Sequence, residues 1–210
     1  MNFHLEGLQS KQLEVLKSLS PFMQEHGFYL GGGTALSLYF GHRTSVDLDW
    51  FTSSSIEDVL ILSQELRKRF LDFVVQQTGP GTLHGTIADI RVSIFEFRYP
   101  LLQTPIVWKE INCPLASLED LACMKLSAIA QRGSRKDFCD IYVLGQERFS
   151  LKEMLDFYIR KFNQDPSPVL YGLVYFDDAE KERMPDMLRK VKWPEIKKTI
   201  RAWVKEIVLP

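Results

Sequence analysis

Apolar and polar residues recur with two different periods along the first half of the chain. Apolar residues three and four apart predict amphipathic helices, and short alternating or apolar runs between turn residues predict strands. Ser55 with Asp58 is expected to cap one helix, and Ala88-Asp89 to turn a hairpin. The pattern predicts helices over 8–26, 34–40 and 56–70, and strands over 28–30, 46–51, 73–77, 83–87, 90–97 and 106–111. This order indicates an α+β fold, a mixed sheet with helices on one side.

From Ser117 onward only the helical period remains. Ser117 with Asp120, and Ser150 with Glu153, have the spacing of N-terminal helix caps. The predicted helices cover 117–132, 136–144, 150–162 and 194–208, with a turn or helix start at 165–168. We therefore predict an α/β core over 1–114, with its boundary near Pro114, and an α-helical domain over 115–210 that shares the active-site cleft.

Composition narrows the class of protein. Of the 210 residues 45% are hydrophobic, which is enough for a packed core, and the net charge of −1 gives no bulk attraction to nucleic acid. No long apolar run opens the chain, so we expect no signal peptide, no membrane contact and a cytoplasmic location. Three cysteines without a CxxC pair, and four histidines without ligand spacing, argue against disulfides and zinc.

A glycine-rich turn, Gly31–Gly33, comes directly before a predicted helix that opens with Thr34. Free N–H groups and partial positive charge at a helix N-terminus suit a phosphate, and the Thr34 hydroxyl is placed to cap the helix or bond a phosphate oxygen. The simpler alternative is a tight turn that needs positive φ. The sequence matches neither the P-loop nor the Rossmann glycine pattern.

Asp47 and Asp49 lie two residues apart on a predicted strand, so their side chains leave the same face, about 6.6 Å apart along the backbone. Their carboxylates could converge on one or two divalent cations, whereas the simpler alternative is a solvated strand face. A third carboxylate from a neighbouring strand is not evident. Ser93 stands near the expected place, with Glu96 on the opposite face and Asp89 in a turn.

Basic residues gather in the helical half. Lys125 and Arg132 share one helix stripe, where Lys125 is either a snorkelling lysine or a group that grips an anion. Arg135-Lys136-Asp137 follows just past a helix break, and Asp137 could accept a proton or orient a lysine. A further basic stretch, Arg189 to Arg201, fits a solvated helix face better than an RNA-binding patch.

These motifs, in this order, resemble the nucleotidyl transferase AbiEii toxin family. The resemblance runs from about residue 28 to the end of the chain. It rests on Gly31-Gly32-Gly33-Thr34-Ala35-Leu36, Arg43-x-Ser45-x-Asp47-x-Asp49, Lys125-Leu126-Ser127-Ala128 with Arg132, Lys136-Asp137-Phe138-Cys139-Asp140-Ile141-Tyr142, and Leu173 to Glu180 with Met184-Pro185.

The resemblance implies a polymerase-β-like nucleotidyltransferase core and NTP-dependent transfer with Mg²⁺, in some related toxins onto tRNA ends. It implies a toxin of a bacterial abortive-infection or toxin–antitoxin pair with an AbiEi-type antitoxin as partner. The implied catalytic set is Asp47, Asp49, Lys125 and Asp137, of which Asp47 and Asp49 would hold the metal and Asp137 would serve as base. The implied nucleotide-binding set is Gly32, Gly33, Thr34, Arg43, Ser45, Lys125, Arg132 and Lys136.

Two other functions fit the residues. The absent third carboxylate suits a catalytically weak or inactive nucleotide-binding module that acts by engaging a partner. The near-neutral charge suits a nucleotidyltransferase whose acceptor is a small molecule rather than RNA.

Overall fold

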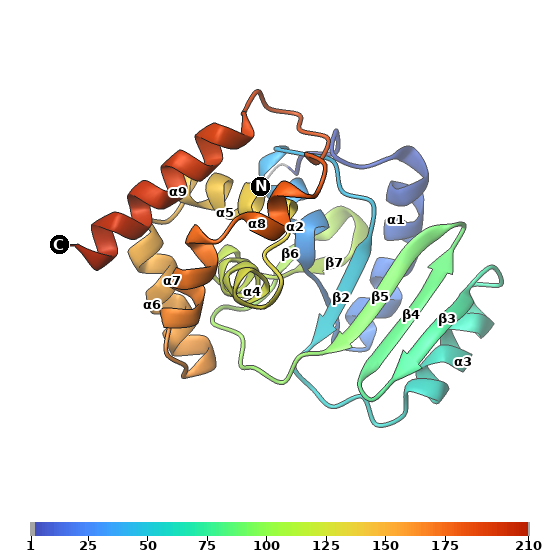
Figure 1. Ribbon diagram of the computed structural model, residues 1–210. Coiled ribbons are helices and arrows are strands. Elements are labelled where there is room, and N and C mark those ends of the chain that lie inside the picture. Colours follow the sequence, from blue (N-terminus) through green and yellow to red (C-terminus); the bar gives the residue numbers. More distant parts are fainter. Residues whose placement is uncertain (1–2, 210) are drawn as a thin grey trace.

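A computed structural model describes residues 3–209, which form a seven-stranded mixed sheet followed by a group of helices (Figure 1). The strand order is β3-β4-β5-β2-β1-β7-β6. The pairs β2–β5 and β1–β7 are parallel and the other neighbours are antiparallel. The strands are β1 (Tyr29–Leu30), β2 (Leu48–Thr52), β3 (Val74–Gly79), β4 (Thr82–Ile87), β5 (Ile90–Glu96), β6 (Ile106–Trp108) and β7 (Cys113–Leu115).

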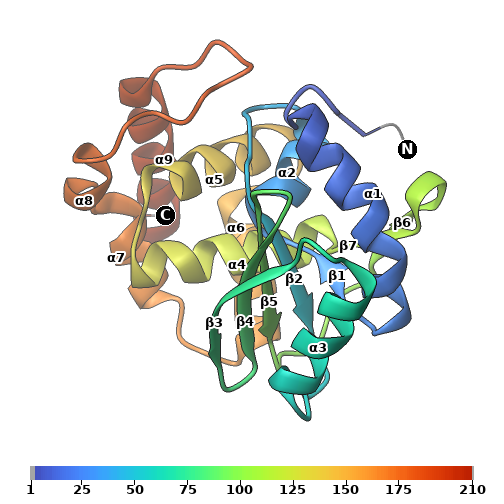
Figure 2. The same ribbon diagram turned by 90° about the vertical axis from the view of Figure 1, so that its right-hand side faces the viewer.

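The helices divide into two groups. The first comprises α1 (Ser10–Glu25) and α3 (Val59–Arg69), which cover one face of the sheet, and α2 (Gly32–Phe40), which follows β1 (Figure 2). The second comprises α4 (Leu118–Gln131), α5 (Arg135–Glu147), α6 (Leu151–Phe162), α7 (Ser167–Val174), α8 (Asp177–Glu180) and α9 (Trp193–Val208). Because α2 packs against α4 and α5, it joins the sheet to the helical half.

The predicted α+β architecture is confirmed, with several differences at element ends. The helix predicted from 56 begins at Val59, because the Asp58 carboxylate, and not Ser55, accepts hydrogen bonds from the first free N–H groups, 2.7 Å from Leu60 N. The strand predicted over 106–111 ends at Trp108, and a 3₁₀ turn over Lys109–Ile111 leads into β7, which the pattern did not predict. The hairpin turn at Ala88 and Asp89 is confirmed by φ values of 49° and 64°.

One buried hydrophobic cluster runs through both halves, from Leu16 and Trp50 to Phe138 and Ile200. Pro114, the boundary predicted from the sequence, lies inside β7, and β7 pairs with β1 in the sheet. The division into 1–114 and 115–210 therefore describes a change of architecture along the chain, and two domains that share a cleft stay a prediction. No helix of residues 3–209 is both long and apolar enough to cross a membrane.

Candidate active site

The glycine turn places the end of β1 against the carboxylate of Asp49. Gly31 N donates to the Asp49 carbonyl over 2.8 Å, and Gly32 has a φ of +64°, so the positive φ expected of this turn is confirmed. A Cβ atom on Gly32 would lie 2.6 Å from Asp49 Oδ2. Only a glycine lets the backbone and this carboxylate approach so closely. The turn thereby presents the start of α2 beside the Asp49 side chain.

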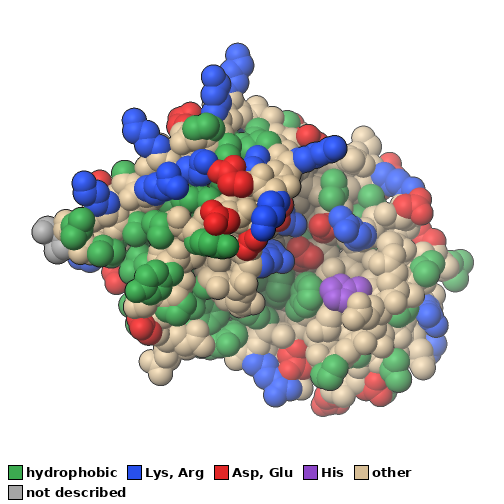
Figure 3. All heavy atoms as spheres, viewed as in Figure 1, with side chains coloured by type: hydrophobic (Ala, Val, Ile, Leu, Met, Phe, Trp, Pro, Cys, Tyr) green, Lys and Arg blue, Asp and Glu red, His purple; other side chains and the backbone are tan. Residues whose placement is uncertain are grey.

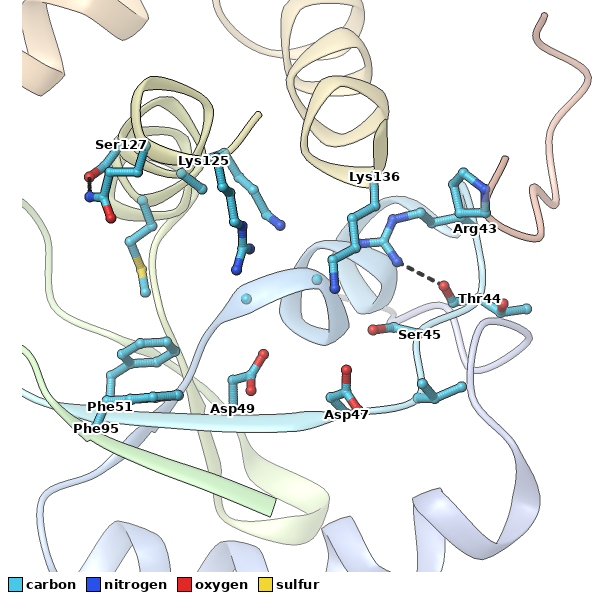
Figure 4. Close-up of a pocket in the computed structure, with 18 of the residues that line it drawn as sticks. Arg43, Thr44, Ser45, Asp47, Asp49, Phe51, Phe95, Lys125, Ser127 and Lys136 are labelled. Carbon is cyan, nitrogen blue, oxygen red and sulfur yellow. Dashed lines mark hydrogen bonds between the residues drawn. The ribbon is translucent and has the colours of Figure 1, made fainter. Parts of the chain in front are cut away.

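Asp49 lies on β2 and Asp47 just before it, and both carboxylates point to the same side, toward Lys136 (Figure 4). Burial, followed by the neighbouring Asp47, raises the pKa of Asp49 above its usual range. Asp47 Oδ1 accepts no hydrogen bond, although Arg91 Nε lies 2.7 Å away as an ion-pair partner. Two carboxylates that repel each other in a half-buried place fit a divalent cation, which would satisfy both.

Across the cleft, buried ion pairs fix the segment that leads from α2 to β2 to the helical half. Arg43 forms a bidentate pair with Asp140 of α5, with Nε 2.7 Å from Oδ1 and Nη2 2.9 Å from Oδ2. His42 Nε2 also lies 2.7 Å from Asp140 Oδ1. Burial alone would raise the pKa of Asp140, but Arg43 and Lys125 outweigh it and hold that pKa well below the usual range.

Lys125 bridges the two aspartates of α5. Its Nζ lies 2.9 Å from Asp137 Oδ1 and 2.7 Å from Asp140 Oδ2, and its side chain is only 7% exposed. The snorkelling interpretation is therefore wrong, because the ammonium is held inside by two carboxylates. Although burial lowers the pKa of Lys125, the two aspartates raise it above its usual range. Lys125 therefore stays charged at the back of the cleft.

Asp137 is fully buried and its oxygens are already engaged. Ser134 Oγ donates to Oδ2 over 2.8 Å, and Arg132 Nε lies 3.2 Å from the same oxygen. Burial opposes ionisation, but Lys125 and then Arg132 lower the pKa of Asp137. This geometry favours the expectation that Asp137 orients Lys125. It gives no support to the base role that the resemblance implied, which stays an untested prediction.

Two cations face the opening. The Arg132 side chain is 61% exposed, and because Asp137 engages only its Nε, the ends of its guanidinium remain available. Lys136 is the second residue of α5, is exposed, and pairs with no carboxylate among the described residues. Its amine points toward Asp47 and Asp49 in Figure 4. The site therefore sets two carboxylates opposite two available cations.

These groups line a cleft of about 580 Å³, a size typical of small-molecule sites. Figure 3 shows the hollow on this face, with basic and acidic side chains around its rim and hydrophobic ones within. The cleft includes most of the predicted nucleotide-binding residues: Gly32, Gly33, Arg43, Ser45, Lys125, Arg132 and Lys136, with Asp47 and Asp49. Thr34 does not line it. Its hydroxyl is buried, 2.9 Å from Ser45 Oγ and also bonded to the Asp47 carbonyl, so it ties α2 to the approach to β2 and does not cap the helix.

One end of the cleft is apolar, which the sequence pattern was not used to predict. Phe51 and Phe95 stack with centroids 5.1 Å apart, and Phe97 and Met124 line the cleft beside them. The sequence does contain a signal for this apolar end, since Phe51 continues the alternation that places Asp47 and Asp49 on one face. Pro185 and Asp186 complete the rim, because Thr44 N donates to the Asp186 carbonyl over 2.8 Å.

Ser93 stands where a third carboxylate was sought. It pairs in register with Asp49 across β2 and β5, and no third Asp, Glu, His or Cys joins the pair as a candidate metal ligand within residues 3–209. Ser93 Oγ lies 3.1 Å from His84 Nδ1 on β4. A serine with a histidine behind it therefore lies beside Asp49, on the strand where a third carboxylate was sought.

Comparisons with known proteins agree with this fold. The arrangement of the sheet and helices is that of nucleotidyltransferases. MenT4, a nucleotidyltransferase toxin of Mycobacterium tuberculosis H37Rv, superposes with a TM-score of 0.60 at 15% identity, over 94% of this chain and 82% of that one. The antibiotic-resistance factor ANT(2'')-Ia superposes with a TM-score of 0.57 at 12% identity, over 73% of this chain and 92% of that one.

Sequence similarity identifies the family. The chain belongs to the family described as nucleotidyl transferase AbiEii toxin, type IV toxin–antitoxin system, which it matches over residues 14–107 and 101–205. An uncharacterized protein of Aquifex aeolicus (strain VF5) is 37% identical over 202 residues, which are 95% of this chain and 97% of that protein. The protein is therefore a nucleotidyltransferase, and the resemblance seen in the motifs is confirmed.

Proposed function

We propose that the protein transfers a nucleotide from an NTP, with Mg²⁺, to a hydroxyl of an RNA such as tRNA, and that it acts in the cytoplasm as the toxin of a bacterial pair with an AbiEi-type antitoxin. The observation that carries this proposal is the convergence of Asp47 and Asp49 opposite Lys136 and Arg132 in one cleft. Carboxylates for a cation beside cations for phosphate match the needs of phosphoryl transfer.

The two ends of the cleft suit the two ends of an NTP. Gly32, Gly33 and Ser45, with the cations Arg132 and Lys136, form a polar end for the triphosphate. The Phe51–Phe95 pair forms an apolar end on which a base can stack. We therefore expect the α-phosphate to lie near Asp47 and Asp49, between the two ends.

Asp47 and Asp49 would hold Mg²⁺, which supplies Lewis-acid polarisation of the phosphate and charge neutralisation when bound. Two protein carboxylates are enough, because Mg²⁺ commonly completes its shell with water and substrate phosphate. The protein's own part is electrostatic. Arg132 and Lys136 stabilise charge that develops on the departing pyrophosphate, while buried Lys125 adds a fixed positive charge behind them.

The identity of the acceptor and the partner rests on the family. Membership in a type IV toxin–antitoxin family supports a toxin role with an antitoxin partner, and the fold shared with the toxin MenT4 agrees with it. The fold shared with ANT(2'')-Ia, together with the net charge of −1, supports a small-molecule acceptor as the second candidate.

A labelled-transfer assay tests the proposal. The protein is incubated with each labelled NTP, Mg²⁺ and total bacterial RNA, beside Asp47→Asn and the control Asp89→Asn, whose carboxylate is exposed and pairs with Lys11 away from the cleft. We expect label on an RNA band with the wild type and the control, and none with Asp47→Asn. Equal labelling by Asp47→Asn would contradict the mechanism.

Absence of labelled RNA would contradict the proposed acceptor. Transfer to an aminoglycoside-type hydroxyl under the same conditions would then establish the small-molecule alternative. NTP binding measured by calorimetry, without any transferred label, would instead support a nucleotide-binding module.

A further inference from the structure

We propose that Ser93 and His84 form a proton relay that activates the acceptor hydroxyl, in the position left open by the absent third carboxylate. This inference rests on the proposed nucleotidyl transfer and adds the group that removes the proton. Three neighbouring strands hold Asp49 and the two relay residues in register. Asp49 on β2 pairs with Ser93 on β5, and Ser93 pairs with His84 on β4.

Paired residues of neighbouring strands leave the same face of a sheet, about 4.8 Å apart per strand. Ser93 and His84 therefore continue the surface that carries the Asp49 carboxylate. They are partly buried, and Ser93 Oγ lies 3.1 Å from His84 Nδ1. The His84 ring also meets Phe95 edge-on, with centroids 5.4 Å apart, which limits its rotation.

The direction of attack points to the same strands. In an in-line displacement the attacking oxygen and the leaving pyrophosphate stand on opposite sides of the α-phosphorus. Arg132 and Lys136, the cations suited to pyrophosphate, both come from the helical half. The sheet beyond Asp49 consists of β5 and then β4. An acceptor hydroxyl that approaches from that side meets Ser93.

Each proton in the proposed relay has a donor and an acceptor. The acceptor hydroxyl passes its proton to Ser93 Oγ as its oxygen bonds to the α-phosphorus, and the Ser93 proton moves to His84 Nδ1. The bond from the α-phosphorus to the bridging oxygen breaks, and its electron pair leaves with pyrophosphate. His84, now an imidazolium, gives one proton to water and returns to the neutral form with the proton on Nε2, whose Nδ1 can accept again. Histidine suits this task because it titrates between pH 5 and 8.

Few charged groups face His84 from the neighbouring strands. Arg91 lies on β5 next to the relay and is 64% exposed, while it pairs with Asp47. Asp49 lies one strand beyond Ser93, and β3 places the neutral Gln77 opposite His84. Asp49 is therefore the carboxylate of this face that lies next to the relay.

The test is the pH dependence of kcat and KM for transfer from the NTP to the acceptor that the wild type labels. For His84→Gln we expect a loss of about 10²-fold in kcat, a changed pH dependence of kcat, and unchanged NTP affinity by calorimetry. Ser93→Ala should lose a similar factor, and the double variant should lose no more, because both residues serve one proton path. His26→Gln, on the surface beside Glu65, is the matched control and should behave as wild type.

A third variant separates the relay from a structural effect. Ser93→Asp supplies a carboxylate that can take the proton itself, so Ser93→Asp with His84→Gln should recover part of the rate that His84→Gln alone loses. A wild-type rate and pH profile in His84→Gln would overturn the relay while leaving the proposed function standing. A wild type that transfers to no acceptor would overturn the proposed function, and the relay with it.

Discussion

At the scale of single residues, the ionised carboxylate of Asp49 lowers the stability of the folded protein but suits the proposed function. Burial and the charge of Asp47 disfavour its ionised form, so its pKa is raised in the folded protein. For a raised pKa, the stability linked to the protonated form is present at low pH and is lost as pH rises through the folded pKa. The ionised carboxylate that a cation needs is thus a destabilising group when no cation is bound.

The first prediction concerns Asp49→Asn in metal-free buffer. Its melting temperature should exceed that of the wild type at pH 8, and the difference should shrink toward acidic pH as Asp49 becomes protonated. Added Mg²⁺ should raise the melting temperature of the wild type but not that of the variant. Differential scanning fluorimetry across pH, with and without Mg²⁺, measures both effects. A variant that melts below the wild type at pH 8 would contradict this account.

The second prediction concerns the glycine turn. Gly32→Ala should destabilise the protein by about 1–3 kcal/mol, because φ is +64° and the new Cβ would press on Asp49 Oδ2 at 2.6 Å. Urea unfolding followed by circular dichroism measures the loss. Gly79→Ala is the matched control, since a Cβ there meets nothing within 4 Å, and its stability should stay near that of the wild type. Equal stability of the two variants would argue against strain at Gly32.

At the scale of elements, one cluster of buried ionisable side chains holds the segment before β2 against α4 and α5. It consists of His42, Arg43, Lys125, Asp137 and Asp140. Its charges are paired and hydrogen-bonded, so removing one partner leaves the others buried without compensation. The cluster keeps Lys125 and Arg43 charged and immobile behind the cleft, which is the preorganisation that electrostatic catalysis needs.

The third prediction concerns Asp140→Asn, which should cost about 3–5 kcal/mol at pH 7, since Arg43 and Lys125 lose their shared carboxylate. The lowered pKa of Asp140 means that its stabilisation is present above about pH 4 and is lost as pH falls through the folded pKa. The gap between wild type and variant should therefore narrow in acid. Urea midpoints at pH 7 and pH 3 measure it, with exposed Asp89→Asn expected to match the wild type.

Local chemistry was predictable from the sequence where it depends on near neighbours. The hairpin turn at Ala88 and Asp89 and the capping box of Ser150 with Glu153 follow from spacings of a few residues, and both are confirmed. Of the two aspartates predicted on one strand, Asp49 lies on β2 and Asp47 directly precedes it. The family resemblance added the association of these motifs into one site, which spacing alone does not provide.

Pairings across the chain were not predictable from spacing. Arg43 and Asp140 are 97 residues apart, and no local period links them. The same limit explains why the pattern did not predict the ion pair of Lys125 with Asp140, 15 residues further along the chain, although it allowed Asp137 to orient a lysine. The three-residue strand β7 was missed because it is too short for a period and acquires its strand geometry from β1 and β6.

At the scale of the whole molecule, the sheet and the helical half meet at the cleft and share one hydrophobic core. The segment that crosses back is Asp186 to Leu188. Thr44 N donates to the Asp186 carbonyl over 2.8 Å, and Leu188 N donates to the His42 carbonyl over 2.9 Å. The chain therefore returns from the helical half and forms hydrogen bonds with the segment before β2, which carries Arg43. Because of these contacts, we expect the two halves on either side of Pro114 to stabilise each other.

The last prediction is that both halves unfold together. Peptides from 28–52 and from 135–208, followed by pulsed hydrogen exchange and mass spectrometry in urea, should lose protection at one common midpoint. Asp140→Asn should lower both midpoints equally, because Asp140 on α5 holds Arg43 of the sheet half through a buried pair. Two separate midpoints in the wild type would instead show that 1–114 and 115–210 are independent domains. In that case the cleft between them could open without unfolding, whereas a common midpoint means that the cations and carboxylates of the site are held in place by the stability of the entire fold.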